Sequence, residues 1–274
     1  MGLPAACPDR PVALVTGASW GIGLACTELL AANGYRVFGT SRRPKAPANH
    51  RVEMLEMEAG SDESVRRCVR EITECAHHLD VLIYSIGDGI GGAVEEVALA
   101  DAEPVFEANF WGAARVTQAI LPMMREQRHG RLVYMSSMGG VIGIPFRGFY
   151  AASKFALEGF AEALRYEVAP FGIGVSIVEP PGVRTPAADH VRAASRKLDA
   201  YQKIEEPFTA RFDEAMRNGM PPERVARAIL SVLSRKAPPL RIAIGAQARS
   251  LSILRRAMPQ HYFEQIVQRI FVSD

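Results

Sequence analysis

The sequence has few cysteines, no long apolar run and no excess of charge of one sign. Its four cysteines form no CxxC pair and have no histidine at zinc-ligand spacing. This spacing argues against a metal site or a disulfide framework and favours a reducing cytoplasm. No apolar stretch approaches the roughly 20 residues needed to cross a bilayer, so we expect no membrane span. The 32 basic and 30 acidic side chains give a net charge of +2, which offers no reason to expect nucleic acid as a partner.

Short apolar runs alternate with stretches of helical spacing along most of the 274 residues. Because buried strands separated by helices pair in parallel, this pattern predicts an α/β fold with a doubly wound parallel sheet, the Rossmann fold. No linker or composition break divides the chain, and we expect a single domain over residues 1–274. The expected strands are 12–16, 36–40, 52–57, 81–85, 131–136, 175–179 and 240–244. The expected helices are 22–33, one capped by Ser61, about 102–127, 149–168 and 222–236.

Two segments depart from the alternation. Residues 183–220 carry Phe208, Phe212 and Met216 at roughly helical spacing, and we expect a helical lid over an apolar substrate. The alternative is that these side chains only pack the lid onto the body. The C-terminal residues have apolar positions at helical spacing and several arginines, which predicts a helical tail docked on the body; a helix lying on a membrane surface is the alternative. The tail arginines are Arg249, Arg255, Arg256 and Arg269, and its apolar positions run from Leu251 to Ile270.

A glycine-rich turn joins the first strand to the first helix. In such a turn, backbone amides and the positive end of the helix dipole form a site for a diphosphate. Gly17 would permit the tight turn, Gly21 the close approach of a ligand, and Gly23 the packing of helix on strand. A tight connection without a ligand is the alternative. The residues of this turn that we expect to bind the cofactor are Gly17, Ser19, Gly21, Ile22 and Gly23.

The end of the second strand indicates which dinucleotide the turn would hold. An acid about 20 residues after the turn usually binds the ribose hydroxyl of NAD, but residues 36–45 contain none. Arg42 and Arg43 stand there instead, and guanidinium groups suit a 2′-phosphate. We therefore predict NADP(H) as the cofactor, with a solvated basic loop as the alternative.

A tyrosine and a lysine four residues apart form the candidate catalytic pair. Tyr150 and Lys154 share one face of a predicted helix. A positive neighbour stabilises a phenolate, so we expect Lys154 to lower the pKa of Tyr150 and prepare it for proton transfer. Ser137 lies thirteen residues earlier at the end of a strand, where ligands of open α/β sheets bind.

These motifs together closely resemble the short-chain dehydrogenase/reductase family over nearly the whole chain. The resemblance is carried by TGASWGIG at 16–23, the serine pair at 136–137, YAASK at 150–154 and PGVRT at 181–185. It implies that Tyr150 is the general acid/base, that Ser137 holds the substrate oxygen and that Lys154 also binds the nicotinamide ribose. It also implies that Asn109 holds a proton-relay water. The further cofactor-binding residues that it implies are Glu58 near the adenine, with Pro181, Gly182 and Thr185 near the nicotinamide.

The chain departs from the family pattern after the fourth strand. Tyr84-Ser85-Ile86-Gly87 replaces the usual NNAG, which removes both amides. Trp20 leaves no basic residue inside the glycine motif, so the NADP(H) prediction depends on Arg42 and Arg43. The lid, the strand around Arg241 and the long tail look more like the hydroxysteroid and retinol dehydrogenase branch than the acyl-carrier-protein reductases.

We expect the protein to be a cytoplasmic NADP(H)-dependent oxidoreductase that forms a homo-oligomer. It would interconvert a ketone and a secondary alcohol on a small, mostly apolar substrate. A ketoreductase of acyl or polyketide biosynthesis is the alternative within the same chemistry. A non-catalytic NADP-binding sensor and an interaction protein that uses its arginine-bearing tail are the alternatives outside it.

Overall fold

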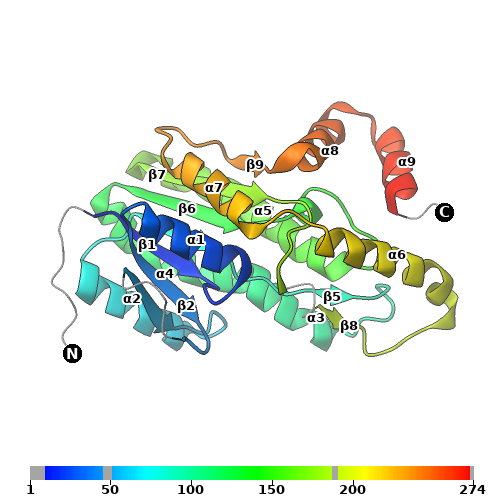
Figure 1. Ribbon diagram of the computed structural model, residues 1–274, viewed down its shortest axis with the longest axis horizontal. Helices are drawn as coiled ribbons and strands as arrows, with labels where there is room; N and C mark the ends of the chain where they lie inside the picture. The colour runs from blue at the N-terminus through cyan, green and yellow to red at the C-terminus, as the bar shows by residue number, and fades with distance from the viewer. Residues whose placement is uncertain (1–9, 46–50, 187–190, 272–274) are drawn as a thin grey trace.

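The computed structural model describes residues 10–45, 51–186 and 191–271, and its main feature is a seven-stranded parallel sheet (Figure 1). The strand order is β3-β2-β1-β4-β6-β7-β9. Ala13 of β1 pairs with Val37 of β2 on one side and Val81 of β4 on the other. The doubly wound parallel sheet predicted from the sequence is confirmed. Its strands are β1 (Val12–Thr16), β2 (Arg36–Ser41), β3 (Val52–Glu56), β4 (Val81–Tyr84), β6 (Gly130–Met135), β7 (Ile173–Glu179) and β9 (Arg241–Ala243).

Helices cover both faces of the sheet because the strands present apolar side chains to both faces. Helices α1 (Gly21–Ala32) and α7 (Pro222–Leu233) pack over one face, which buries Ala13 and Val15. Helices α2 (Asp62–Ala76), α4 (Gly112–Gln127) and α5 (Gly148–Val168) pack over the other, which buries Leu14. The Ser61 hydroxyl caps α2 by accepting from the Ser64 amide at 3.2 Å, as the sequence predicts.

The long helix expected over 102–127 is interrupted. It consists of α3 (Leu99–Phe106), a π-helical turn η1 (Glu107–Trp111) and α4. A π turn adds one residue to a helical turn without leaving the helix, so the apolar spacing on either side still reads as one helix. Such turns are often found at functional sites, and this one holds Asn109.

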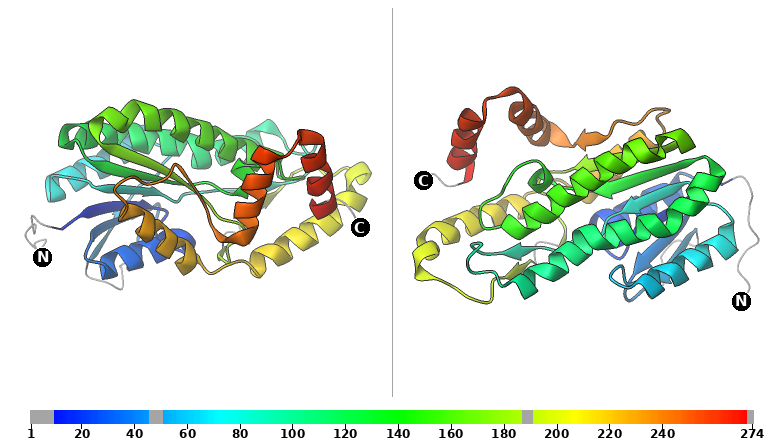
Figure 2. Two further views of the ribbon diagram at one scale, coloured as in Figure 1. Left: turned by 90° about the horizontal axis from the view of Figure 1, so that it is seen from above. Right: turned by 180° about the vertical axis from the view of Figure 1, so that it is seen from behind.

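The lid and the tail meet on one side of the molecule (Figure 2). The lid region contains β8 (Arg192–Ala193), which pairs with β5 (Ile90–Gly91), and α6 (Asp199–Arg217). The tail, expected as one element, is two helices, α8 (Gly245–Ala257) and α9 (Gln260–Phe271). They bury Leu251 and Phe263 against Phe208 of α6, so the tail is docked on the body. Residues 187–190 of the lid and the side chains of Arg256 and Ile270 lie outside the described residues.

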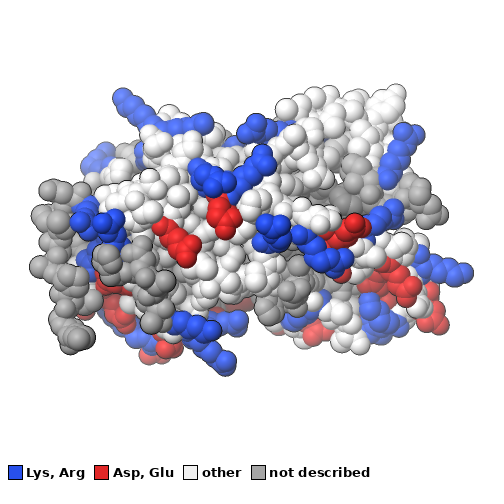
Figure 3. Space-filling view, viewed as in Figure 1, with Lys and Arg blue, Asp and Glu red and all other residues white. Residues whose placement is uncertain are grey.

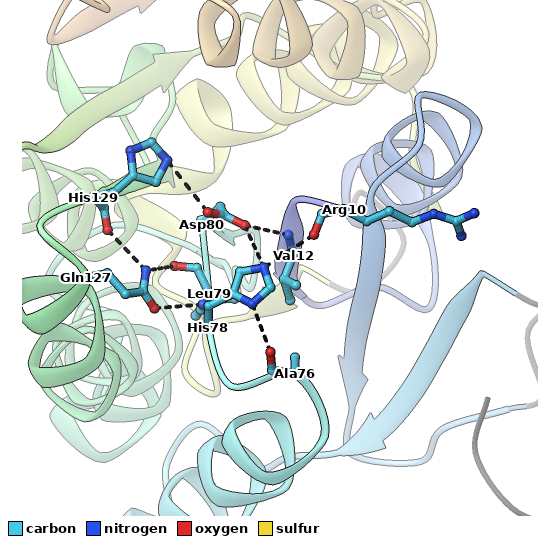
Figure 4. A network of polar contacts seen from close by, with 8 residues as sticks. All are labelled: Arg10, Val12, Ala76, His78, Leu79, Asp80, Gln127 and His129. Carbon is cyan, nitrogen blue, oxygen red and sulfur yellow. Dashed lines mark hydrogen bonds and ion pairs between the residues drawn. The ribbon is translucent and has the colours of Figure 1, made fainter. Parts of the chain in front are cut away.

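Polar contacts fix the edge of the sheet where β1 and β4 begin (Figure 4). The Asp80 carboxylate accepts from the Val12 amide at 2.7 Å and lies 3.4 Å from the His78 ring. The Gln127 side chain exchanges two hydrogen bonds, each 3.0 Å long, with the backbone of Leu79. These groups bond to one another and to backbone, so this edge serves to hold the fold.

The surface shows no single charged stripe on the face drawn in Figure 3, where lysine and arginine are scattered and interleaved with acids. Within the described ranges, no helix is long and apolar enough to cross a membrane.

Candidate active site

The glycine turn lies at the carboxyl end of β1, between β2 and β4, where the sheet order reverses. Gly17 and Gly21 have φ values of +67° and +60°, which side-chain-bearing residues rarely adopt. A Cβ on Gly23 would lie 2.1 Å from the Gly17 carbonyl oxygen, so only glycine fits there. Ser19 is exposed in the turn, and Ile22, in the first turn of α1, is partly buried against the sheet. This geometry leaves backbone, rather than side chains, facing a ligand.

The first turn of α1 is open to an anion. Trp20 precedes the helix and makes no side-chain cap, and the first turn contains no acidic residue. The amide groups of a helix N-terminus need acceptors, and the helix dipole favours negative charge there. The turn therefore has the donors and the field that a diphosphate requires.

The segment after β7 folds back onto this turn. The Thr185 methyl group lies 3.1 Å from the position that a Cβ on Gly21 would take. The Gly182 carbonyl accepts from the Met220 amide at 2.9 Å, and the Arg184 amide donates to the Met220 carbonyl at 2.9 Å. The two ends of the lid are therefore joined directly above the glycine turn, with Pro181 at the end of β7.

Arg42 and Glu58, both predicted to bind the cofactor, lie together at the ends of β2 and β3. Their side chains are 80% and 54% exposed and form a loose ion pair, with Arg42 Nε 4.0 Å from Glu58 Oε2. Arg43 is exposed, and its amide donates to the Ser41 hydroxyl at 3.2 Å. Exposed guanidinium groups in a weak pair can reorient toward a phosphate at small cost.

The serine, tyrosine and lysine of the predicted catalytic set come together where β6 meets α5. Ser137 follows β6, and its hydroxyl oxygen accepts from the Gly139 amide at 3.1 Å. Ser137 also hydrogen-bonds the Tyr150 side chain. Lys154, one turn further along α5, is buried and donates to the Met135 carbonyl at 2.9 Å. Its Nζ lies 5.9 Å from the centroid of the Tyr150 ring.

The electrostatics of this pair differ from the expectation. Burial raises the pKa of Tyr150, and the hydrogen bond with Ser137 offsets only part of that rise. The predicted lowering of the Tyr150 pKa by Lys154 is therefore wrong for the chain without a cofactor. Burial also lowers the pKa of Lys154 to about 8, against an upward effect of Glu158. For each group, desolvation outweighs the neighbouring interaction that opposes it, with Ser137 for the tyrosine and Glu158 for the lysine.

Asn109 is fully buried in the π-helical turn η1 and lies against α5. Its amide nitrogen donates to the Asp88 carbonyl and to the Ser153 hydroxyl, both at 2.9 Å. Its oxygen accepts from the Asp88 amide at 2.8 Å. A side chain on Gly87 would come within 3.4 Å of Asn109 Oδ1 and 3.7 Å of Lys154 Nζ. The loop after β4 therefore lies directly on the predicted relay residue and the lysine.

The departure from NNAG has a structural explanation. Tyr84 is fully buried, and its hydroxyl donates to the carbonyl of Ala108, the residue before Asn109, at 2.7 Å. Gly112 makes the space, since a Cβ there would lie within contact distance of the Tyr84 hydroxyl. The Ser85 amide donates to the Thr16 hydroxyl at 3.0 Å. The tyrosine thus supports the turn that holds Asn109.

Two charged contacts near the site were not predicted. Asp88 pairs with Arg192 of β8 at 3.0 Å and ties the lid strand to the loop after β4. Glu158, four residues after Lys154, is buried and bonds Arg241 of β9. The sequence shows Glu158 as an acid on the inward face of a predicted helix. Its partner, Arg241, is 83 residues away in the chain.

Comparisons with known proteins agree with this geometry. The model of the family described as short chain dehydrogenase matches residues 11–196. A protein named 3-ketodihydrosphingosine reductase from Bacteroides thetaiotaomicron is 36% identical over 265 residues, which cover 96% of this chain and 98% of that protein. Human retinol dehydrogenase 8 is 33% identical, with coverage of 88% and 84%. The crystal structure of a short-chain dehydrogenase from Streptomyces avermitilis has a TM-score of 0.81 and 32% identity, and covers 96% of both chains.

Proposed function

The chain belongs to the short-chain dehydrogenase/reductase family, and from this premise we propose that it is an NADP(H)-dependent enzyme that interconverts a ketone and a secondary alcohol. One observation carries the proposal. Ser137, Tyr150, Lys154 and Asn109 converge at the carboxyl edge of the sheet, next to an uncapped helix N-terminus in a glycine turn. Proton transfer and dinucleotide binding thus have their residues side by side.

The residues present fit a dinucleotide. Gly17, Gly21 and Gly23 form a cradle that side chains would fill, and the amides of α1 are open to a diphosphate. Arg42 and Arg43 are the groups for a 2′-phosphate. Thr185 lies over the turn, where it would meet the nicotinamide amide. When bound, a nicotinamide cofactor supplies the hydride that the side chains of a protein cannot.

The proposed role of each side chain follows from its contacts. Ser137 holds and polarises the substrate carbonyl oxygen, a preorganised donor for developing negative charge. Tyr150 gives its phenolic proton to that oxygen, and in the reverse direction takes it back. Lys154 holds a positive charge beside the resulting phenolate. Asn109, with Asp88 and Ser153 as partners, orders the polar groups that return the proton to Tyr150.

We propose that the substrate is lipophilic. The relatives named for 3-ketodihydrosphingosine and for retinol act on long apolar molecules. In this chain, Ile142 and Ile144 of the loop after Ser137 share an apolar cluster with Phe208 of α6. Burial of an alkyl chain beside such side chains contributes about 25 cal/mol for each Å². An apolar tail next to the ketone should therefore dominate affinity.

A spectrophotometric screen tests the function. NADPH oxidation is followed with long-chain 3-ketones, a cyclic ketone and a short polar ketone, and each assay is repeated with NADH. We expect turnover with the long-chain ketones and NADPH, and none with Tyr150→Phe. No turnover with any ketone, and no oxidation of the matching alcohols, would overturn the proposed activity. Tight NADPH binding without turnover would favour the sensor alternative.

Self-association is part of the same proposal. Trp111, Phe155 and Tyr166 are 52%, 43% and 70% exposed on η1 and α5. Contiguous exposed apolar patches mark association surfaces, and we propose that these three side chains belong to one. Sedimentation velocity should show a dimer or larger, and Phe155→Lys with Tyr166→Lys should shift it toward monomer. A wild-type chain that stays monomeric at micromolar concentration would contradict this.

A further inference from the structure

A cluster of charged side chains lies around Glu158, one helical turn after Lys154 on α5. Arg241 of β9 reaches Glu158 of α5 at 2.9 Å and Glu179 of β7 at 3.7 Å. Arg241 Nη2 lies 2.6 Å from Oε2 of Glu162, one turn further along α5. The Ser252 hydroxyl of α8 donates to Glu179 at 3.2 Å. Three elements of the fold, β9, α5 and β7, therefore meet at one guanidinium, and α8 joins them through Glu179.

Burial divides the cluster into an inner and an outer part. The side chains of Glu158 and Glu179 are 6% and 2% exposed, whereas Glu162 is 44% exposed. Lys154 is buried as well. Arg241 thus contacts both buried carboxylates, and Lys154 lies one helical turn from Glu158. Burial of an unpaired ion is costly, so a buried cluster of this kind is stable only when its positive and negative charges balance.

Resting on the proposed function, we propose that Glu158 is a positioning residue for Lys154. Its buried carboxylate, held by Arg241, keeps the lysine in its charged form on the Met135 carbonyl. Residues four apart on a helix lie about 5–6 Å apart at Cβ, so the carboxylate is the near counter-charge of the ammonium. Nothing in the family comparison assigns this role.

The charges around Lys154 support this assignment. Burial is the main cause that lowers the pKa of Lys154, and Glu158 is the charge that raises it. The Glu158 carboxyl has its own pKa raised by burial and by Glu179, while Ser136 and Arg241 lower it. The other titratable or polar groups around Lys154 and Glu158 are Tyr150 and Glu162 on α5, Ser136 after β6, Glu179 on β7 and Arg241 on β9. Glu158 itself lies one helical turn after Lys154 on α5.

A purely structural role is the competing explanation, in which Glu158 only ties β9 to α5. Glu162 offers the matched control because it sits on the same helix and bonds the same arginine from the exposed side. Loss of either carboxylate would loosen that tie. Only the loss of Glu158 would remove the counter-charge of Lys154.

The test measures the titration of Lys154 directly. The full-length chain without cofactor is labelled with [¹³Cε]-lysine, and the Lys154 signal is assigned by its absence in Lys154→Met. In Glu158→Gln we expect its titration midpoint to fall by roughly two pH units, as for one charge removed at about 6 Å in an effective dielectric constant of about 20. In Glu162→Gln and in Glu158→Asp it should stay within about 0.3 unit of wild type.

An unchanged midpoint in folded Glu158→Gln, or an equal fall in Glu162→Gln, would overturn the proposal. If Glu158→Gln does not fold, Glu158→Gln with Arg241→Gln replaces it, because that pair keeps the buried charges balanced. A smaller downward shift is expected, because the loss of the Arg241 cation opposes the loss of the carboxylate. This titration needs no substrate, so it stands even if the wild type reduces no ketone. In an active enzyme, the basic limb of kcat/KM at saturating NADPH should move with it.

Discussion

Replacement of the buried lysine should make the protein more stable at neutral pH than at alkaline pH, relative to the wild type. Lys154 is 3% exposed and donates to one carbonyl. Burial lowers its pKa from 10.5 to about 8, so the folded chain holds the charged form at a cost. Lys154→Met removes that cost together with the catalytic group. Stability and activity should therefore change in opposite directions at neutral pH.

The size and sign of the effect follow from proton linkage. A pKa of about 8 in the folded chain against 10.5 when unfolded corresponds to about 3 kcal/mol. Below pH 8 both states are protonated and the folded chain bears the whole cost. Between pH 8 and 10.5 the folded chain binds fewer protons than the unfolded one, so the contribution of this lysine becomes less unfavourable. The advantage of Lys154→Met should shrink over that window by about 3 kcal/mol.

Urea denaturation of wild type and variant from about pH 7 to about pH 10 measures this difference. The lost bond to Met135 shifts all variant values by a constant and does not alter the trend. Lys203→Met, an exposed lysine of α6, is the control and should show no such trend. A difference between wild type and Lys154→Met that stays constant with pH would refute the reasoning.

Four further substitutions test the site. Tyr150→Phe should lower kcat by far more than tenfold, which is 1.4 kcal/mol, because the proton donor is lost; NADPH affinity by fluorescence titration should change little, and retention of a tenth of wild-type kcat would exclude the role. The wild type should prefer NADPH to NADH in kcat/KM, and Arg42→Ala should narrow the preference by about tenfold through the loss of a charged hydrogen bond; equal values for both cofactors in the wild type would contradict it. Phe208→Ala should cost about 3–5 kcal/mol of stability in denaturant melts because Phe208 is 2% exposed among apolar side chains. Phe212→Ala, at a half-buried position, should instead raise KM for long-chain ketones. An unchanged KM in both phenylalanine variants would exclude a contact between the lid and the substrate.

The sheet was predictable because its signals are local. Runs such as Val12–Thr16 are continuous and apolar, and each is followed by a helical pattern that needs a face to bury. The two-residue strands Ile90–Gly91 and Arg192–Ala193 are too short to show any periodicity. The π-helical turn at Asn109 was also missed because one extra residue leaves the flanking apolar spacing intact.

The candidate site divides in the same way. Ser137, Tyr150 and Lys154 belong to short motifs, and one helix and one strand end hold them. The contact of Glu158 with Arg241 exists only because β9 pairs with β7 beside α5, which no local pattern specifies. The replacement of NNAG was interpreted as a loss of amides, whereas Tyr84 bonds Ala108 across 24 residues.

The apolar cluster shared by the lid, the loop after Ser137 and the tail affects how this enzyme can be re-engineered. Phe208 of α6, Ile144 of the loop after Ser137, and Phe263 of α9 bury one another. A lid transplanted from a relative would therefore arrive without its matching tail and leave unfilled volume. Chimaeras should exchange 183–220 and the last two helices as one cassette, because each segment buries side chains of the other.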